Sequence, residues 1–88
     1  MSVPYIDEIH PDYTIRVFDS SLDPEEFYWH RDKKDRRITA VSGEGWAIQR
    51  DNELPIPLEK DKNYSIKKES WHRILKGNGD LILKIEEL

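Results

Sequence analysis

Two histidines and one aspartate have the types and the spacing of a metal site. His30 and Asp32 lie two residues apart. On a β-strand this spacing would point both side chains to one face, with backbones about 6–7 Å apart, whereas a helix would separate them by roughly 200°. His72 would complete a set of two imidazoles and one carboxylate, which leaves coordination positions open for a substrate or oxygen. The alternative is that these histidines are buried and satisfied by local hydrogen bonds.

Each of these histidines lies in the same tripeptide. Trp29-His30-Arg31 recurs later in the chain as Trp71-His72-Arg73. In an extended chain each histidine faces one side, and its tryptophan and arginine neighbours face the other. If the two segments are neighbouring strands, we expect both imidazoles to point into the same cavity.

Short strands are predicted to position these residues. Alternating or apolar runs predict strands at 13–18, 37–41, 46–49, 64–67, 71–75 and 81–85. Residues 42–45 predict a hairpin turn between the second and third of these, and residues 76–80 predict a tight turn before the last. Residues 54–58 carry prolines at alternate positions, which permits only an extended edge or a crossing loop. Seven or so short strands at this spacing are typical of a sandwich or barrel.

The segment before His30 has a helix-opening pattern. Asp23-Pro24-Glu25-Glu26 offers an acidic N-cap, a proline at the first helical position and a glutamate three residues after the cap. A helix that continued to residue 37 would have a half-basic face with little apolar surface to bury. We therefore predict one helical turn near residue 24 and an extended chain from Phe27 onward, which is the conformation that the metal site requires.

From His30 to Ile85 the chain resembles the cupin superfamily of small β-barrels. The first cupin motif reads His-x-His, three or four residues, Glu, six residues and Gly, and its positions hold His30, Asp32, Arg36 and Gly43. The second motif keeps its spacing, but only His72 matches. Residues 64–86 are similar to the closing strands of the cupin module in bifunctional mannose-6-phosphate isomerases. The resemblance implies an all-β, single-domain cupin-type β-barrel (jelly roll) with little or no helix.

The whole chain of 88 residues is expected to form one cupin domain. Residues 1–12 would be an N-terminal arm and residues 13–88 the barrel. The absence of cysteine excludes a disulfide scaffold, a zinc finger and an iron–sulfur site. Apolar runs are too short for a membrane span or a signal peptide, so we expect a cytoplasmic protein without a membrane partner. The net charge of −4 argues against nucleic acid as a partner.

Arg36 stands where the cupin motif has a glutamate, which removes one potential metal ligand. Ile38 and Ala40 share its strand face, so Arg36 is predicted to point into the barrel. In one interpretation the two histidines and Asp32 bind a divalent ion (Zn, Fe, Mn or Ni), and Arg36 binds a carboxylate or phosphate of the substrate. In the other, Arg36 pairs with Asp32 and the cavity is metal-free.

The sequence therefore predicts a small cupin that binds a divalent metal and a small polar or anionic ligand. The isomerase resemblance implies a sugar or sugar phosphate and an isomerase- or epimerase-like activity. One alternative is a non-catalytic, metal-free ligand-binding cupin. Another is a non-haem iron oxygenase-like cupin, because His-x-Asp with a distant histidine is also the ligand pattern of iron/2-oxoglutarate oxygenases. We expect a homodimer that buries an outward layer of Tyr5, Phe18 and Trp29.

Overall fold

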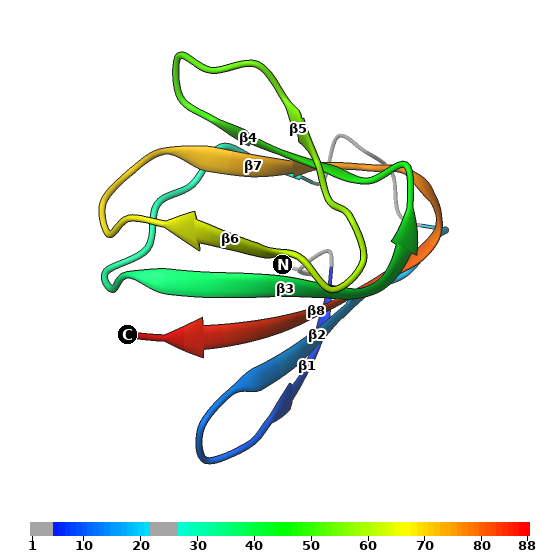
Figure 1. The fold of residues 1–88 in the computed structure, drawn as a ribbon, viewed down its shortest axis with the longest axis horizontal. Helices are drawn as coiled ribbons and strands as arrows, with labels where there is room; N and C mark the ends of the chain where they lie inside the picture. Colours follow the sequence, from blue (N-terminus) through cyan, green and yellow to red (C-terminus); the bar gives the residue numbers. More distant parts are fainter. Residues whose placement is uncertain (1–4, 22–26) are drawn as a thin grey trace.

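The computed structural model describes residues 5–21 and 27–88, which form eight strands in two antiparallel sheets. The larger sheet has the order β1 (Ile6–Ile9), β2 (Thr14–Phe18), β8 (Asn78–Glu87), β3 (Arg36–Glu44) and β6 (Asn63–Ile66). The smaller sheet has the order β5 (Ile56–Pro57), β4 (Ala47–Arg50) and β7 (His72–Leu75). Figure 1 shows the smaller sheet lying across one side of the larger one. The predicted all-β class is confirmed.

The core lies between the two sheets and follows the two-residue period of the strands. In β8, the side chains of Leu81, Leu83 and Ile85 are buried, and those between them face outward. The remaining buried hydrophobic side chains come from both sheets and their connections, and they are Phe18, Ile38, Ala40, Trp46, Ile48, Leu58, Ile66 and Ile74. These buried side chains form one contiguous core to which both sheets contribute.

The predicted hairpin at residues 42–45 is wrong, because β3 and β4 belong to different sheets. Register shifts near Ser42 end the regular pairing of β3 with β8, and Gly43 and Gly45 then take positive φ values of 144° and 74°. Such values favour glycine and turn the chain around the barrel corner. The predicted tight turn at residues 76–80 is also a corner, since β7 lies in the smaller sheet and β8 begins at Asn78.

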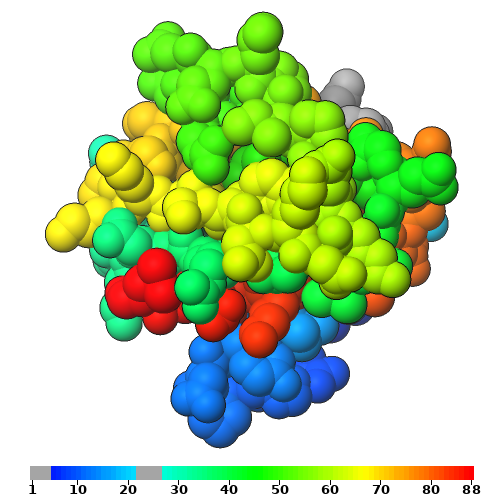
Figure 2. Space-filling view, viewed as in Figure 1, coloured from blue at the N-terminus to red at the C-terminus, as the bar shows by residue number. Residues whose placement is uncertain are grey.

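The N-terminal part of the chain departs from the sequence analysis in two places. Within the segment predicted as an arm, β1 pairs with β2 and forms one edge of the larger sheet. Figure 2 shows this hairpin projecting from the body of the molecule. Two residues of the predicted outward layer face inward instead. Tyr5 packs against the core, and Phe18 is 4% exposed, because it pairs with Leu81, whose side chain faces the core.

The chain between β2 and β3 was predicted to contain one helical turn and then an extended segment. The helical turn near residue 24 falls outside the described residues. From Phe27 to Asp35 the chain is not helical, which agrees with the prediction of an extended segment. Residues 5–21 and 27–88 contain no helix, and therefore none that is long and apolar enough to cross a membrane.

Candidate metal centre

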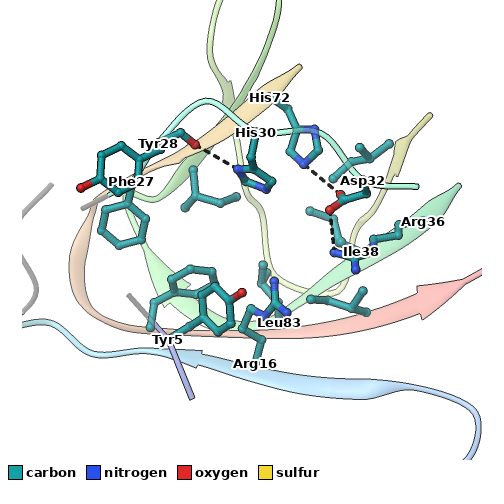
Figure 3. Close-up of a pocket in the computed structure, with 14 residues that line it drawn as sticks. Tyr5, Arg16, Phe27, Tyr28, His30, Asp32, Arg36, Ile38, His72 and Leu83 are labelled. Atoms are coloured by element: carbon teal, nitrogen blue, oxygen red, sulfur yellow. Dashed lines mark hydrogen bonds and ion pairs between the residues drawn. The ribbon is translucent and has the colours of Figure 1, made fainter. Parts of the chain in front are cut away.

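An isolated antiparallel bridge joins the two Trp-His-Arg triplets. The backbone N–H groups of His30 and His72 each donate to the carbonyl of the other residue at 2.9 Å. The centroids of the two imidazole rings are 4.3 Å apart. Asp32 follows on the same side, and one ligand atom from each of the three residues lies within 4.8 Å of the others. The three side chains thus meet at one cavity, as Figure 3 shows.

The tryptophans and arginines of the triplets pack on the opposite side of this bridge. Antiparallel pairing places each tryptophan beside the arginine of the other triplet. The guanidinium carbon of Arg73 lies 4.7 Å from the ring centroid of Trp29, and that of Arg31 lies 5.2 Å from the ring centroid of Trp71. Two cation–π contacts therefore support the bridge from outside while the imidazoles face the cavity.

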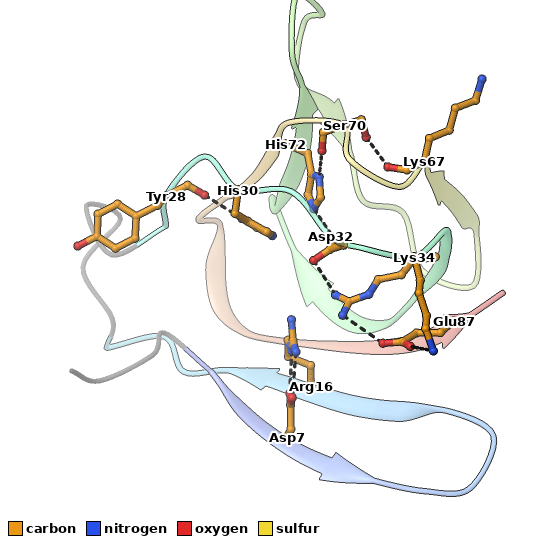
Figure 4. Close-up of polar contacts among 11 residues, drawn as sticks. Asp7, Arg16, Tyr28, His30, Asp32, Lys34, Lys67, Ser70, His72 and Glu87 are labelled. Carbon is orange, nitrogen blue, oxygen red and sulfur yellow. Dashed lines mark hydrogen bonds and ion pairs between the residues drawn. The ribbon is translucent and has the colours of Figure 1, made fainter.

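Backbone carbonyls orient both imidazoles. Nδ1 of His30 donates to the Tyr28 carbonyl and Nδ1 of His72 donates to the Ser70 carbonyl, each at 2.9 Å (Figure 4). A carbonyl oxygen only accepts, so the proton of each neutral ring is on Nδ1 and Nε2 keeps a lone pair. Metal-binding histidines are commonly held in this way by a hydrogen bond at the other ring nitrogen.

The carboxylate of Asp32 has one oxygen without a hydrogen-bond partner. Oδ2 is buried and unpaired among the described residues, and it lies 3.2 Å from Nε2 of His72. Burial lowers the pKa of His72, so this ring is neutral at neutral pH. Two lone pairs therefore face each other, which is unfavourable unless a cation or proton lies between them. The donor set of two imidazoles and one carboxylate fits a divalent ion.

Arg36 extends from β3 into the same cavity, as its shared strand face with Ile38 predicted. Its Nη1 lies 3.3 Å from Oδ1 of Asp32, and its Nη2 lies 3.3 Å from Oε1 of Glu87. The contact between Arg36 and Asp32 is the one that the metal-free interpretation requires. It uses Oδ1, however, and leaves Oδ2 facing His72. The pairing therefore does not occupy the oxygen that a metal would need.

Sequence reasoning missed Arg16, which lines the cavity together with Arg36. Its Nε and Nη2 donate to the two carboxylate oxygens of Asp7 at 2.7 and 2.9 Å, and its guanidinium carbon lies 3.7 Å from the ring centroid of Tyr5. The two-residue period of a strand could have indicated that Arg16 faces inward, because Arg16 lies two residues before Phe18 and shares its strand face. The prediction of an outward layer containing Phe18 placed this strand face outside, and with it Arg16.

No protein-family model and no curated protein matches this chain. Three solved structures illustrate what it is similar to. A cupin domain from Bordetella pertussis has a TM-score of 0.67 and 15% identity, covering 100% of this chain and 98% of that one. KdgF from Halomonas sp. has a TM-score of 0.67 and 14% identity, covering 96% of this chain and 80% of that one. Fe(II)-HppE with an alternative substrate has a TM-score of 0.68 and 14% identity, covering 96% of this chain and 48% of that one.

These likenesses establish the fold. The chain has the cupin β-barrel fold, as the sequence resemblance predicted. The chain spans about half of the HppE chain, whose structure contains Fe(II). The similarity of residues 64–86 to mannose-6-phosphate isomerases stays a prediction.

Proposed function

We propose that this protein is a cupin that binds a divalent metal through His30, Asp32 and His72 and a small anionic ligand beside it. One observation carries the proposal: a buried oxygen of Asp32 without a hydrogen-bond partner faces the Nε2 lone pair of His72. Three protein ligands leave coordination positions open for a second molecule. Zinc, iron, manganese and nickel all accept imidazole nitrogen and carboxylate oxygen.

A bound divalent ion would act as a Lewis acid on a carbonyl or hydroxyl group of the ligand. The chain's own residues would supply orientation. The carbonyls of Tyr28 and Ser70 hold the two rings, and Asp32 and Glu87 hold the guanidinium of Arg36 at the edge of the site. Arg36 would donate its remaining N–H groups to the acidic group of the ligand. An isomerase- or epimerase-like activity on a sugar phosphate is the finer proposal, and it rests on the sequence resemblance.

Metal analysis of three proteins tests this proposal. Wild type dialysed against zinc, manganese, nickel or ferrous ion should retain about one metal per chain. Asp32→Asn should lose it, because an amide replaces the charged ligand. Glu8→Gln is the matched control, because the Glu8 carboxylate also contacts a histidine, accepting from His10 at 2.6 Å, but on the surface. The Glu8→Gln variant should retain metal. Wild type without metal, or Asp32→Asn with a full complement, would contradict the proposal.

The contact between Arg36 and Asp32 at 3.3 Å favours a second candidate, a metal-free binding protein. In that protein Arg36 alone would hold the acidic group of the ligand, and a chelator would leave ligand binding unchanged. The oxygenase-like alternative requires iron, which the HppE structure contains. Oxygen uptake by the ferrous protein, measured with and without candidate ligands, tests it.

The homodimer that the sequence predicts cannot bury Phe18 between subunits, because Phe18 lies in the core, but an exposed edge strand is a second candidate surface for it. β1 ends the larger sheet, and its Ile6 and Ile9 are 74% and 81% exposed. Pairing with a second copy along this edge would place a neighbouring strand beside Ile6 and Ile9, which lie on opposite faces of β1, and would add backbone hydrogen bonds to that strand. Light scattering should give the dimer mass for wild type and the monomer mass for the double variant Ile6→Lys, Ile9→Lys. Leu54→Lys, at an exposed hydrophobic residue outside β1, should leave the mass unchanged. A monomeric wild type would contradict the dimer.

A further inference from the structure

The cavity beside the candidate metal centre has mostly apolar walls. Its polar or charged lining residues are Arg16, His30, Asp32, Arg36 and His72. Besides two tyrosines, the other lining residues carry hydrocarbon side chains, and they are Phe18, Phe27, Ile38, Ile66, Ile74, Leu83 and Ile85. A polyhydroxylated ligand would lose hydrogen bonds to water against these walls and gain few in return. The lining therefore favours a ligand whose body is hydrophobic.

The apolar and charged groups are separated within the cavity. Figure 3 shows Phe27 and Tyr28 on one side, and Asp32 and Arg36 on the other. The ring of Phe27 packs against that of Phe18 with centroids 5.5 Å apart, and Tyr5 meets Phe18 edge to face at 5.6 Å. One side of the cavity is therefore aromatic. A ligand with one acidic end and one hydrophobic end matches this division.

Arg16 adds a second guanidinium to this cavity. It pairs with Leu83 in the register of β2 and β8, and Leu83 is a buried core residue, so Arg16 faces inward. Asp7 binds Nε and Nη2 in a two-point contact and leaves Nη1 outside that pair. The ring of Tyr5 stacks against the same guanidinium. Arg16 is thus positioned by two neighbours, and its Nη1 group, outside the pair with Asp7, can donate to an anion.

The volume of the cavity limits the size of the ligand. It is about 190 Å³. Cavities for drug-sized ligands are larger, at roughly 300–1,000 Å³. The ligand is therefore of about the size of a single aromatic ring with a short acidic side chain.

We infer that this cavity selects small carboxylates with a hydrophobic, preferably aromatic, body, and that Arg16 is a ligand-binding residue that contacts the carboxylate. The body would lie against Phe18 and Phe27, and the acidic group would lie between Arg16 and the candidate metal centre. This inference rests on the proposed function, because the site is the same. It narrows the anionic ligand to a hydrophobic carboxylate, and the sugar phosphate becomes the competing outcome.

Calorimetric titration of the metal-loaded protein with three probes tests the ligand class. Phenylacetate has the predicted features, phenylacetamide has the same body without the charge, and mannose 6-phosphate is anionic and polyhydroxylated. Phenylacetate should bind at least about tenfold more tightly than either of the others, since a charge-assisted hydrogen bond and the apolar contact each contribute that much. Equal or tighter binding of mannose 6-phosphate, or equal binding of phenylacetamide, would overturn the inference.

A matched pair of arginine variants tests the role of Arg16. Arg16→Met should weaken phenylacetate binding at least about tenfold and leave phenylacetamide binding and metal content unchanged. Arg37 makes the same two-point contact with Glu86 at 3.2 and 3.0 Å, but it is exposed on the outside of β3. Arg37→Met should therefore bind phenylacetate as wild type does. Arg16→Lys, which keeps a cation, gives an intermediate affinity if Arg16 acts as inferred. Wild-type affinity in Arg16→Met would overturn the assignment.

The metal and ligand measurements separate the two proposals. A chain that binds no metal but binds phenylacetate through Arg16 would refute the proposed function and leave the ligand class standing. A chain that binds one metal but prefers mannose 6-phosphate would refute the ligand class alone.

Discussion

The two Trp-His-Arg triplets have the same sequence but different surroundings. His72 lies in β7, where Arg50 of β4 is its partner in the sheet, and it is 2% exposed. His30 lies in an exposed segment outside the named strands. In the described structure this segment makes one β-bridge, which pairs His30 with His72. Both rings donate a hydrogen bond from Nδ1 to the backbone carbonyl of the residue two positions earlier. The candidate centre is therefore based on β7, and residues 27–32 complete it through the bridge.

The largest effect is expected from removing one imidazole at a time. His72→Ala should weaken zinc binding by about 100-fold or more, and His30→Ala by about tenfold, because an exposed ligand is more easily replaced by water. Competition with a chromophoric chelator measures both affinities. His72→Gln fills more of the buried space and serves as a second variant if the alanine variant unfolds. A greater loss in His30→Ala than in both His72 variants would contradict the central role of β7.

A smaller effect is expected at the arginine that shares Asp32 with the metal site. Arg36→Glu removes a cation and places a carboxylate where the cupin motif has one, so zinc binding should tighten by roughly tenfold. The same competition assay measures it, with Arg37→Glu as a control on the outer face of the same strand. Weaker zinc binding in Arg36→Glu than in wild type would show that Arg36 is not beside the metal.

The pH dependence of stability should report the burial of the His72 ring. Burial lowers the pKa of His72 in the folded state, while the unfolded chain has the ordinary value of about 6.5. Between those values the unfolded state binds more protons, so the melting temperature of the metal-free protein should fall as pH drops below about 6.5. His72→Gln should reduce this fall, because it removes the buried ring that gains the proton on unfolding. An unchanged fall in His72→Gln would contradict the effect of burial on this ring.

The smallest effect is expected on the outer side of the bridge. Arg73→Met and Arg31→Met should each lower the free energy of unfolding, by about 0.5–1 kcal/mol for a cation–π contact at an exposed site. Arg73→Met should lower the free energy of unfolding by more than Arg31→Met does. Arg73 lies nearer its tryptophan, and it also donates from Nε to Oε1 of Gln49 at 2.9 Å. Chemical denaturation measures both differences. A larger loss in Arg31→Met would reverse the ranking of the two triplets.

Local sequence patterns predicted the features that depend on residues close together in the chain. The two-residue period of Leu81, Leu83 and Ile85 identified β8 and its buried face. The spacing of His30 and Asp32 placed both side chains on one side of an extended segment, and the repeated tripeptide indicated its pairing with residues 71–73.

The features that the sequence did not predict depend on contacts between distant strands. Glycine after a strand fits a hairpin and a barrel corner equally well, and only the pairing of β3 with β8 decides against the hairpin at Gly43. The inward face of Arg16 is set by its register with Leu83, which lies far along the chain. The guanidinium of Arg36 in the cavity wall was predicted from its own strand, but that of Arg16 became evident only with this register.

A crystal structure of the protein loaded with zinc, with the metal located by its anomalous scattering, tests the central claim most directly. The account predicts one peak per chain, bounded by Nε2 of His30, Nε2 of His72 and Oδ2 of Asp32. The absence of a peak there, with both oxygens of Asp32 bound by Arg36 instead, would contradict it.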